Sequence, residues 1–199
     1  MSYRVNDIFY SLQGEGRNSG RAALFVRFSG CNLKCSFCDT DFSTFREMTA
    51  VDICEALQKE ALHSNVSLPS AGQRLLCVLT GGEPSLQADA ELISKLHSLG
   101  LEVAMESNGT LPPPDGIDWL TVSPKTRPAV RRCDELKCLF SGSGNIDDYG
   151  IKASYYYLQP LDTGNAGDNM RIAAECTEYI KRHPKWRLSL QTHKLVGFK

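Results

Sequence analysis

Short runs that favour β-strands alternate with stretches of helical periodicity along most of this 199-residue chain. The strand-like runs are rich in β-branched and aromatic residues and lie at 23–28, 75–79, 101–105, 119–122, 135–140, 155–158 and 187–190. Helices are expected to begin at residues 50, 85 and 168. Such alternation is typical of an α/β fold with a mostly parallel sheet. Because a complete eight-unit barrel takes about 250 residues, we expect a partial, open (β/α) TIM-like barrel of about six strands, formed by a single domain over residues 1–199.

Two of the expected helices have recognisable boundaries. Thr49 and Asp52 have the spacing of a capping box at the start of the first helix. Asp168 is expected to cap the last helix, and Pro184 prevents its continuation because proline has no backbone N–H to donate.

Polar motifs directly follow most of the expected strands. These motifs are Cys31–Cys38, Thr80–Pro84, Glu106–Gly109, Ser123–Lys125, Gln159–Asp162 and Gln191–Lys194. In parallel α/β folds the carboxyl ends of the strands form the active face. We therefore expect the motifs to meet at one mouth of the partial barrel.

Charge and hydropathy exclude several classes of protein. The chain has 22 basic and 23 acidic side chains and a formal net charge of -1, which argues against nucleic-acid binding by bulk phosphate neutralisation. The N-terminal segment lacks the apolar stretch of a signal peptide, and no run approaches about eighteen apolar residues. We expect a cytoplasmic protein without a membrane segment, whose eight cysteines stay reduced.

Three of the cysteines, Cys31, Cys35 and Cys38, have the spacing C-x3-C-x2-C. Three thiolates on one short loop can face a common centre. A structural zinc site is closed by four ligands, and no nearby Cys or His pair supplies the fourth. An iron–sulfur cluster held by three thiolates leaves one iron open to a substrate or cofactor, so we expect a cluster here. Zinc and plain structural thiols are the alternatives.

The other five cysteines are expected to fill the core. Cys77 lies inside an apolar strand, Cys176 lies on a helical stripe and Cys54 flanks another stripe, as small buried hydrophobic residues do. Cys133 and Cys138 lie in or beside one strand without a partner pair in sight, which favours buried thiols over a second metal site.

The motifs together resemble a known family. The cysteine spacing, with Phe37 before the last cysteine and Gly81–Glu83 after the next strand, looks like the radical S-adenosylmethionine (SAM) enzymes. Within that superfamily the chain is similar to the 7-carboxy-7-deazaguanine synthases of the queuosine and 7-deazapurine pathway. The matching segments are Ser11–Gly16, Cys38–Thr40, Thr80–Pro84, Ser123–Lys125 and Ser189–Lys194. The resemblance spans residues 8–196 and implies a trimmed barrel that forms a homodimer.

The resemblance implies a radical reaction. Cys31, Cys35 and Cys38 would hold a 4Fe–4S cluster whose unique iron binds the amino and carboxylate groups of SAM. An electron from a flavodoxin or ferredoxin would release a 5′-deoxyadenosyl radical, which removes hydrogen from C6 of 6-carboxy-5,6,7,8-tetrahydropterin. Ring contraction with loss of ammonia, a carbon–nitrogen lyase reaction, would give 7-carboxy-7-deazaguanine and regenerate SAM. The product would serve a tRNA modification pathway or another 7-deazapurine route.

The same resemblance implies which residues contact SAM. They are Phe37, Cys38, Asp39, Gly82, Ser123, Pro124, Lys125, Gln159, Pro160, Leu161 and Asp162. Gly82 suits this task physically, since a residue without Cβ lets the end of a strand approach a ligand closely. Its alternative role is an ordinary turn.

Substrate and magnesium contacts are implied in the same way. The substrate residues would be Leu12, Gln13, Gly14, Arg27, Thr80, His193 and the terminal carboxylate of Lys199. The planar guanidinium of Arg27 suits a substrate carboxylate. Thr40, which on its own would be interpreted as a turn residue, would be a ligand of Mg²⁺, an ion that prefers oxygen and keeps several waters.

Two other functions fit part of the sequence. A glycyl-radical-enzyme activase shares the cysteine pattern but has no need of the Gln13–Gly16 and Gln191–Lys194 segments. A non-catalytic iron–sulfur or zinc module would leave Gly81–Glu83 and Lys125 without a task.

Overall fold

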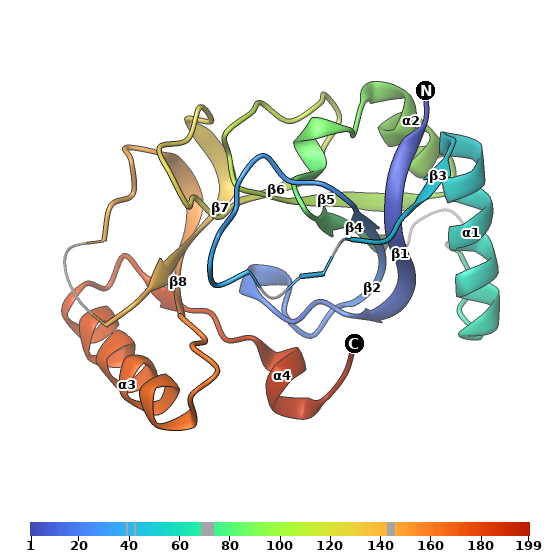
Figure 1. Cartoon of the computed structure of the whole chain (residues 1–199). Coiled ribbons are helices and arrows are strands. Elements are labelled where there is room, and N and C mark those ends of the chain that lie inside the picture. Colours follow the sequence, from blue (N-terminus) through green and yellow to red (C-terminus); the bar gives the residue numbers. More distant parts are fainter. Residues whose placement is uncertain (39, 42, 69–73, 143–145) are drawn as a thin grey trace.

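The computed structural model describes residues 1–38, 40–41, 43–68, 74–142 and 146–199. The strands within these residues are β1 (Tyr3–Leu12), β2 (Ala22–Phe28), β3 (Arg46–Met48), β4 (Leu75–Gly81), β5 (Leu101–Ser107), β6 (Trp119–Val122), β7 (Arg132–Phe140), β8 (Lys152–Pro160) and β9 (Arg187–Leu188). They form one sheet in the order β3-β1-β2-β4-β5-β6-β7-β8-β9 (Figure 1). Every neighbouring pair from β2 to β9 is parallel. The expected α/β fold with an open, mostly parallel sheet is confirmed.

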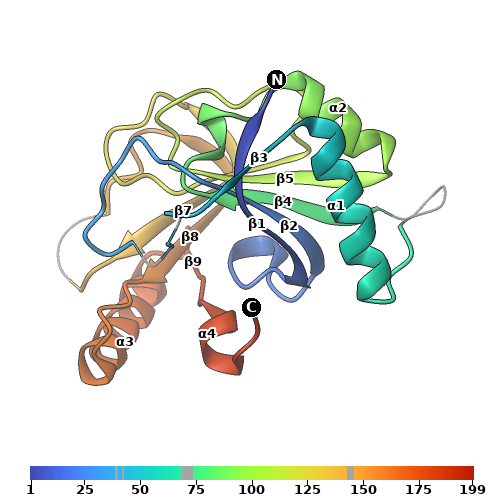
Figure 2. The same ribbon diagram turned by 45° about the vertical axis from the view of Figure 1, so that its right-hand side comes forward.

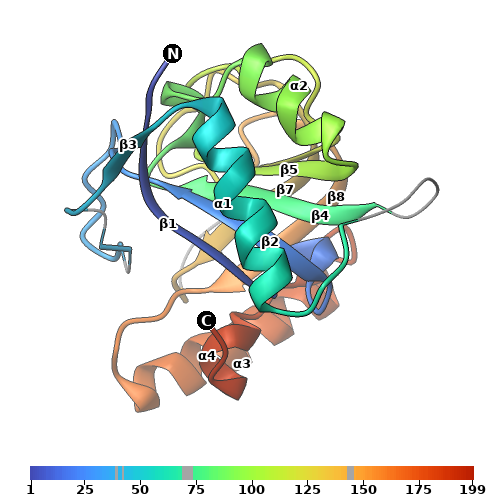
Figure 3. The same ribbon diagram turned by 90° about the vertical axis from the view of Figure 1, so that its right-hand side faces the viewer.

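Helices and short 3-10 turns lie around this curved sheet. They are α1 (Ala50–His63), α2 (Ala90–Ser98), α3 (Ala166–Arg182) and α4 (Thr192–Val196), with 3-10 turns η1 (Gly16–Asn18) and η2 (Pro84–Leu86). Helix α1 packs on β1 and on α2, and α2 packs on β5, so the two helices lie side by side (Figure 3). Helix α3 packs on β8 at the opposite end of the sheet (Figure 1).

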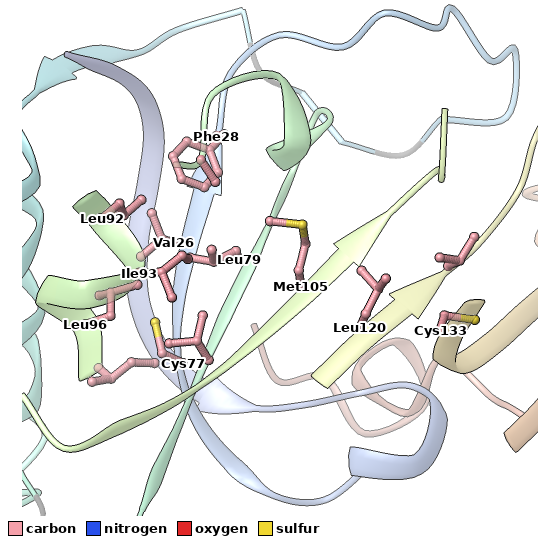
Figure 4. Packing of buried hydrophobic residues seen from close by; sticks show 14 of the residues in the cluster. Val26, Phe28, Cys77, Leu79, Leu92, Ile93, Leu96, Met105, Leu120 and Cys133 are labelled. Carbon is pink, nitrogen blue, oxygen red and sulfur yellow. The ribbon is translucent and has the colours of Figure 1, made fainter. Parts of the chain in front are cut away.

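Strand β2 shows how side chains divide between the two faces of the sheet. Leu24, Val26 and Phe28 alternate along it and join the core under α1 and α2, where each is fully buried (Figure 4). The residues between them face the concave side, where Phe25 stacks on Phe9 with ring centroids 4.8 Å apart. The sheet therefore packs one apolar face against α1 and α2, while its concave face combines a smaller apolar cluster with polar side chains such as Arg27.

Several expected boundaries need correction. Helix α2 begins at Ala90 with Asp89 as its cap, and not at residue 85, because residues 84–86 form the separate turn η2. Asn165 caps α3 by accepting from the amide of Asp168, which lies in the first turn and is not the cap. Strand β9 ends at Leu188. The capping box of Thr49 and Asp52 is confirmed.

Strands β1 and β3 were not expected from the sequence; they pair antiparallel with each other and extend the sheet beyond β2. Of the five cysteines expected in the core, Cys77, Cys133, Cys138 and Cys176 are buried and Cys54 is half-buried against it. Burial raises the pKa of the Cys133 and Cys138 thiols to about 12, which keeps both neutral. No helix in the described part of the chain combines the length and apolar character needed to cross a membrane.

Candidate active site

A cavity of about 590 Å³ opens on the concave side, at the carboxyl ends of the parallel strands. Residues from the ends of β2, β4, β5, β7 and β8 line it, and so do loop residues from every one of the polar motifs predicted to converge. The volume lies within the roughly 300–1,000 Å³ of small-molecule and cofactor sites. The predicted mouth of the partial barrel is thus a single pocket.

Most of the predicted site residues line this pocket. Those expected to contact substrate all do: Leu12, Gln13, Gly14, Arg27, Thr80, His193 and Lys199. The expected SAM residues that do are Phe37, Cys38, Gly82, Ser123, Lys125, Gln159, Pro160, Leu161 and Asp162. Thr40 lines it as well. Pro124 is buried behind the lining, and Asp39 lies outside the described residues.

The three-cysteine loop follows β2 and forms one rim of the pocket. Cys31, Cys35 and Cys38 are free thiols, the first two half-buried and the third exposed. Cys31 Sγ accepts from the amide of Leu33 over 3.4 Å, and the amide of Cys38 donates to the carbonyl oxygen of Cys35 over 3.2 Å. Burial raises the pKa of the Cys31 thiol, and the nearby charges of Glu83, Cys35 and Cys38 raise it further. The thiols are therefore neighbours on one rim.

The donor set fits an iron–sulfur cluster better than a closed zinc site. No fourth cysteine is found among the described residues that line the pocket, so one metal position would stay open to a ligand. The three sulfur atoms do not converge on one point, since the described residues contain no set of three or more Cys, His, Asp or Glu side chains arranged to hold a metal ion. Binding of a cluster would therefore require the three cysteine side chains to move closer together.

Asn32, between the first two cysteines, joins the loop to the end of β5. Its Oδ1 accepts from Nδ2 of Asn108 over 3.0 Å, and its Nδ2 donates to Oγ1 of Thr110 over 2.8 Å. Thr110 in turn donates to Oδ1 of Asn108 over 2.6 Å. This closed polar ring fixes one side of the cysteine loop to the sheet.

Glu83 forms hydrogen bonds with the same segment at the end of β5. Its buried carboxylate accepts from the amide and hydroxyl of Ser85, from the Ser107 hydroxyl over 2.8 Å and from the Asn108 amide over 2.7 Å. Both oxygens are thus used within the protein. Glu83 joins the ends of β4 and β5 rather than offering a free carboxylate to a ligand.

A buried lysine forms the floor of the pocket. Lys137 on β7 is only 3% exposed, and its Nζ donates to Glu15 Oε2 over 2.6 Å and to Glu106 Oε2 over 3.0 Å. Burial would raise the pKa of Glu15, but the charge and hydrogen bond of Lys137 outweigh it and hold that pKa at about 2. The Lys137 pKa, which burial would lower, is raised by the charges of Glu106 and Glu15. Glu15 and Lys137 are therefore both ionised near neutral pH.

Glutamine side chains hold the outer oxygens of the two carboxylates. Gln13 Nε2 donates to Glu106 Oε1 over 2.9 Å, while Gln159 and Gln191 donate to Glu15 Oε1 over 3.1 Å and 2.9 Å. The network thereby connects the N-terminal loop, β5, β8 and the C-terminal segment.

Glu135 lies two residues before Lys137 on the same face of β7. Its Oε2 accepts from the amide of Arg17 over 2.8 Å, and a Cβ on Gly16 would stand 1.9 Å from its Oε1. Burial raises the pKa of Glu135 to about 7, against the lowering effect of Lys137 and with a further increase from Glu106. Near neutral pH a large part of this carboxyl group is protonated.

The predicted substrate residues come from the end of β1 and the loop after it, from β2 and β4, and from the C-terminal segment. The Arg27 guanidinium lies over the ring of Phe9 at 5.2 Å, and Lys199 Nζ lies over the same ring at 4.6 Å. A Cβ on Gly14 would stand 2.4 Å from Nδ1 of His193, so glycine is required there for the C-terminal segment to dock. Figure 2 shows α4 beside the loop that precedes β2, and the Thr192 amide donates to the Gly14 carbonyl oxygen over 3.0 Å.

The predicted SAM residues line the remaining side. Lys125 Nζ donates to the Ser123 carbonyl oxygen over 3.1 Å, and burial lowers its pKa. Asp162 accepts from Lys194 Nζ over 2.8 Å and from Asn169 Nδ2 over 2.7 Å. The hydrogen bond from Lys194 holds the Asp162 pKa well below its usual range. The Asp162 carboxylate therefore reaches the pocket with partners of its own.

Sequence reasoning missed the charged network of the floor. The sequence did contain an indication of this network. Glu135 and Lys137 are charged residues two positions apart in a mostly apolar strand, so both side chains lie on one face of it. Buried charges at such positions are paired, so partners at the pocket were to be expected.

Comparison with known proteins places these features in context. A family model of the radical SAM superfamily matches residues 25–130. The 7-carboxy-7-deazaguanine synthases of Bacteroides thetaiotaomicron and Bradyrhizobium diazoefficiens are 44% and 40% identical to this chain, each alignment covering 100% of both proteins. The synthase of Nitratidesulfovibrio vulgaris is 44% identical over 99% of both. The crystal structure of QueE from Escherichia coli superposes with a TM-score of 0.68 at 25% identity, covering 97% of this chain and 95% of that one.

Proposed function

Since the chain belongs to the 7-carboxy-7-deazaguanine synthases of the radical SAM superfamily, we propose that its pocket converts 6-carboxy-5,6,7,8-tetrahydropterin to 7-carboxy-7-deazaguanine with loss of ammonia. This is a lyase reaction of queuosine biosynthesis, and membership in the superfamily brings a 4Fe–4S cluster and SAM with it. The observation that carries the proposal is the meeting of the cysteine loop and all the polar strand-end motifs in one cavity. Family membership also sets aside the activase and the non-catalytic module.

The cysteine loop would hold the cofactors at the rim. When bound, the cluster supplies the single electron that starts radical chemistry from SAM. Cys31, Cys35 and Cys38 are proposed as its ligands because they are the cysteines that line the pocket within the described residues. SAM is proposed to lie against this rim, in contact with Gly82, Ser123, Lys125, Phe37 and the Gln159–Asp162 loop, all of which line the cavity.

The pterin is proposed to lie on the opposite wall. Arg27 carries its charge on a flat guanidinium supported by the Phe9 ring, an arrangement suited to a carboxylate. Leu12, Gln13 and Gly14 would contact the edge of the pterin ring, and Thr80, at the end of β4, would lie beside it. His193 and Lys199, held against the same wall by the docked C-terminal segment, would close the site on the substrate and limit entry of water.

We also propose a site for Mg²⁺, an approach for the electron donor and a homodimeric assembly. Thr40 lines the pocket on the cysteine rim, where one oxygen ligand with substrate and water can hold Mg²⁺. Cys38 and Phe37 are exposed on that rim, which gives a flavodoxin or ferredoxin access to the cluster. The homodimer rests on the family resemblance and is tested by sedimentation of the reconstituted protein.

Anaerobic reconstitution tests the function directly. The loaded protein is mixed with SAM, a reductant, Mg²⁺ and carboxytetrahydropterin, and the product is followed by absorbance and mass. We expect 7-carboxy-7-deazaguanine with an unchanged amount of SAM. An intact cluster that gives no such product would overturn the synthase proposal.

A further inference from the structure

We propose that Lys137 is a positioning residue of the synthase, holding the carboxylates of Glu15 and Glu106 in place as anions at the wall that binds the pterin. The inference rests on the proposed function and extends it to a residue that acts through its neighbours. Each carboxylate would accept hydrogen bonds from the amino and ring N–H groups of the substrate. Carboxylates suit this edge because, when ionised, they only accept hydrogen bonds.

The geometry places Lys137 between two segments that are far apart in the sequence. Its Nζ reaches from β7 across β6 to Glu106 on β5 over 3.0 Å, and to Glu15 on the N-terminal loop over 2.6 Å. The lysine side chain is 4% exposed, whereas those of Glu15 and Glu106 are 20% and 21% exposed. The lysine therefore lies behind the carboxylates, which are the groups that face a ligand.

The remaining hydrogen bonds fix how the carboxylates point. Gln13, in the segment predicted to bind substrate, donates to Glu106, and Gln159, in the segment predicted to bind SAM, donates to Glu15. Through the two carboxylates, Lys137 is thus linked to both predicted binding segments. A displacement of its Nζ would be transmitted to both.

Energetics favour a functional reason for this buried charge. Burying an ammonium group and two carboxylates has a large desolvation cost, and apolar residues of similar size often give equal or better stability. A core built only for stability has no need of Lys137. Two carboxylates side by side at the wall of a pocket, by contrast, disfavour each other's ionisation, and a cation beside them offsets this effect.

Other titratable groups also face these three side chains from the packed elements. They are Glu135, which acts on Lys137, and Lys125, which interacts with Lys137, Glu15 and Glu106. Lys125 is half-buried and hydrogen-bonded to Ser123, and burial raises the pKa of Glu135 to about 7, so part of this carboxyl group is neutral near neutral pH. Without Lys137, Glu15 would lose the cation that holds its pKa low and would take up a proton more easily, although Lys125 would stay nearby.

Pterin binding without turnover tests the proposal. Holoenzyme with cluster and SAM, but no reductant, is titrated anaerobically with carboxytetrahydropterin from about pH 6 to about pH 8.5. We compare K137M with wild type, and use K181M, which removes an exposed lysine of α3, as the matched control. We expect K137M to bind about a hundredfold more weakly than wild type near pH 6, with the gap falling to about tenfold near pH 8.5 as the carboxylates ionise. K181M should bind as wild type does.

Conservative and compensating variants separate this role from a purely structural one. K137R keeps a permanent charge, so its affinity relative to wild type should not change with pH. The double variant K137M/E15Q removes one charge of each sign and serves if K137M does not fold. In it the pair of like charges is gone, so the affinity of K137M/E15Q relative to E15Q should fall by less, and depend less on pH, than that of K137M relative to wild type.

Each outcome decides the question. A loss in K137M that is equal at every pH, or no loss, overturns the role of Lys137. Wild-type protein that binds pterin but forms no deazaguanine overturns the proposed function and leaves the Lys137 test readable.

Discussion

Gly82 lies directly against the backbone of Gly30, because a Cβ on Gly82 would stand only 1.9 Å from the Gly30 carbonyl oxygen. The amide of Glu83 donates to the same oxygen over 2.9 Å, so the turn after β4 is bonded to the start of the cysteine loop. A side chain at position 82 cannot be accommodated without breaking that contact. Glycine is required here for packing, in addition to any approach of a cofactor.

Gly82→Ala is therefore expected to displace the cysteine loop. Overpacking of this kind lowers the free energy of unfolding by about 1–3 kcal/mol, and reconstituted protein should hold less iron per chain. Gly167→Ala is the matched control, since the nearest atom to a Cβ there is 3.3 Å away at the end of the Asn165 side chain. Urea unfolding and iron analysis measure both effects. Equal iron contents in the two variants would contradict the argument.

Asn32→Ala should loosen the cluster without unfolding the protein. The substitution removes the bonds to Asn108 and Thr110 that join the loop to the sheet. We expect the cluster to be lost to a chelator several-fold faster, as each hydrogen bond is worth about 1 kcal/mol. Lys34→Ala, on the same loop, removes no hydrogen bond that the structure shows and is the control. The loss is followed by the visible absorbance of the cluster, and an unchanged rate would show that the polar ring does not hold the loop.

Thr40→Ala should weaken the dependence of activity on Mg²⁺ while leaving iron and sulfide content unchanged. Thr40 lines the pocket near the cysteine loop but is not one of the proposed ligands of the cluster. Removing the hydroxyl should raise the Mg²⁺ concentration for half-maximal rate about tenfold, and Thr40→Ser should restore it. The rate is measured against Mg²⁺ concentration in both variants. The same curve in Thr40→Ala and wild type would make the magnesium assignment wrong.

The rhythm of strands and helices predicted the sheet and the pocket because both follow from local pattern. Alternating apolar runs set the strands, and parallel strands bring their carboxyl ends to one edge, so the motifs had to meet. The capping box at Thr49 needed only residues three positions apart. Such features depend on near neighbours in the sequence and can be predicted from it.

Features that depend on residues far apart in the sequence could not be predicted from it. Strand β1 mixes polar and apolar residues, and only its antiparallel pairing with β2 and β3 makes it a strand. The partners of Lys137 lie 122 and 31 residues away. Nothing in the local sequence could pair them, although the charged residue in a buried strand indicated that some partner existed.

Glu135→Gln should change how stability depends on pH. Burial first, and the charge of Glu106 as well, raise the pKa of Glu135 to about 7 in the folded chain despite Lys137, compared with 4.5 for an exposed glutamate. A raised pKa means that the stabilisation is complete below about pH 4.5 and is lost as the pH rises through about 7. Wild type should therefore lose up to about 3 kcal/mol of unfolding free energy between about pH 5 and pH 8 through this group alone.

The variant cannot ionise, so it should be more stable than wild type near pH 8, and this advantage should fade toward about pH 5. Its amide oxygen can still accept from the Arg17 amide, which preserves the one hydrogen bond seen at this side chain. Urea unfolding of the cluster-free protein at both pH values measures the difference, with the exposed Glu178→Gln on α3 as the control for loss of a negative charge. If Glu135→Gln and wild type lose stability in parallel, the carboxyl group of Glu135 is already ionised in the folded protein and the pH dependence comes from elsewhere.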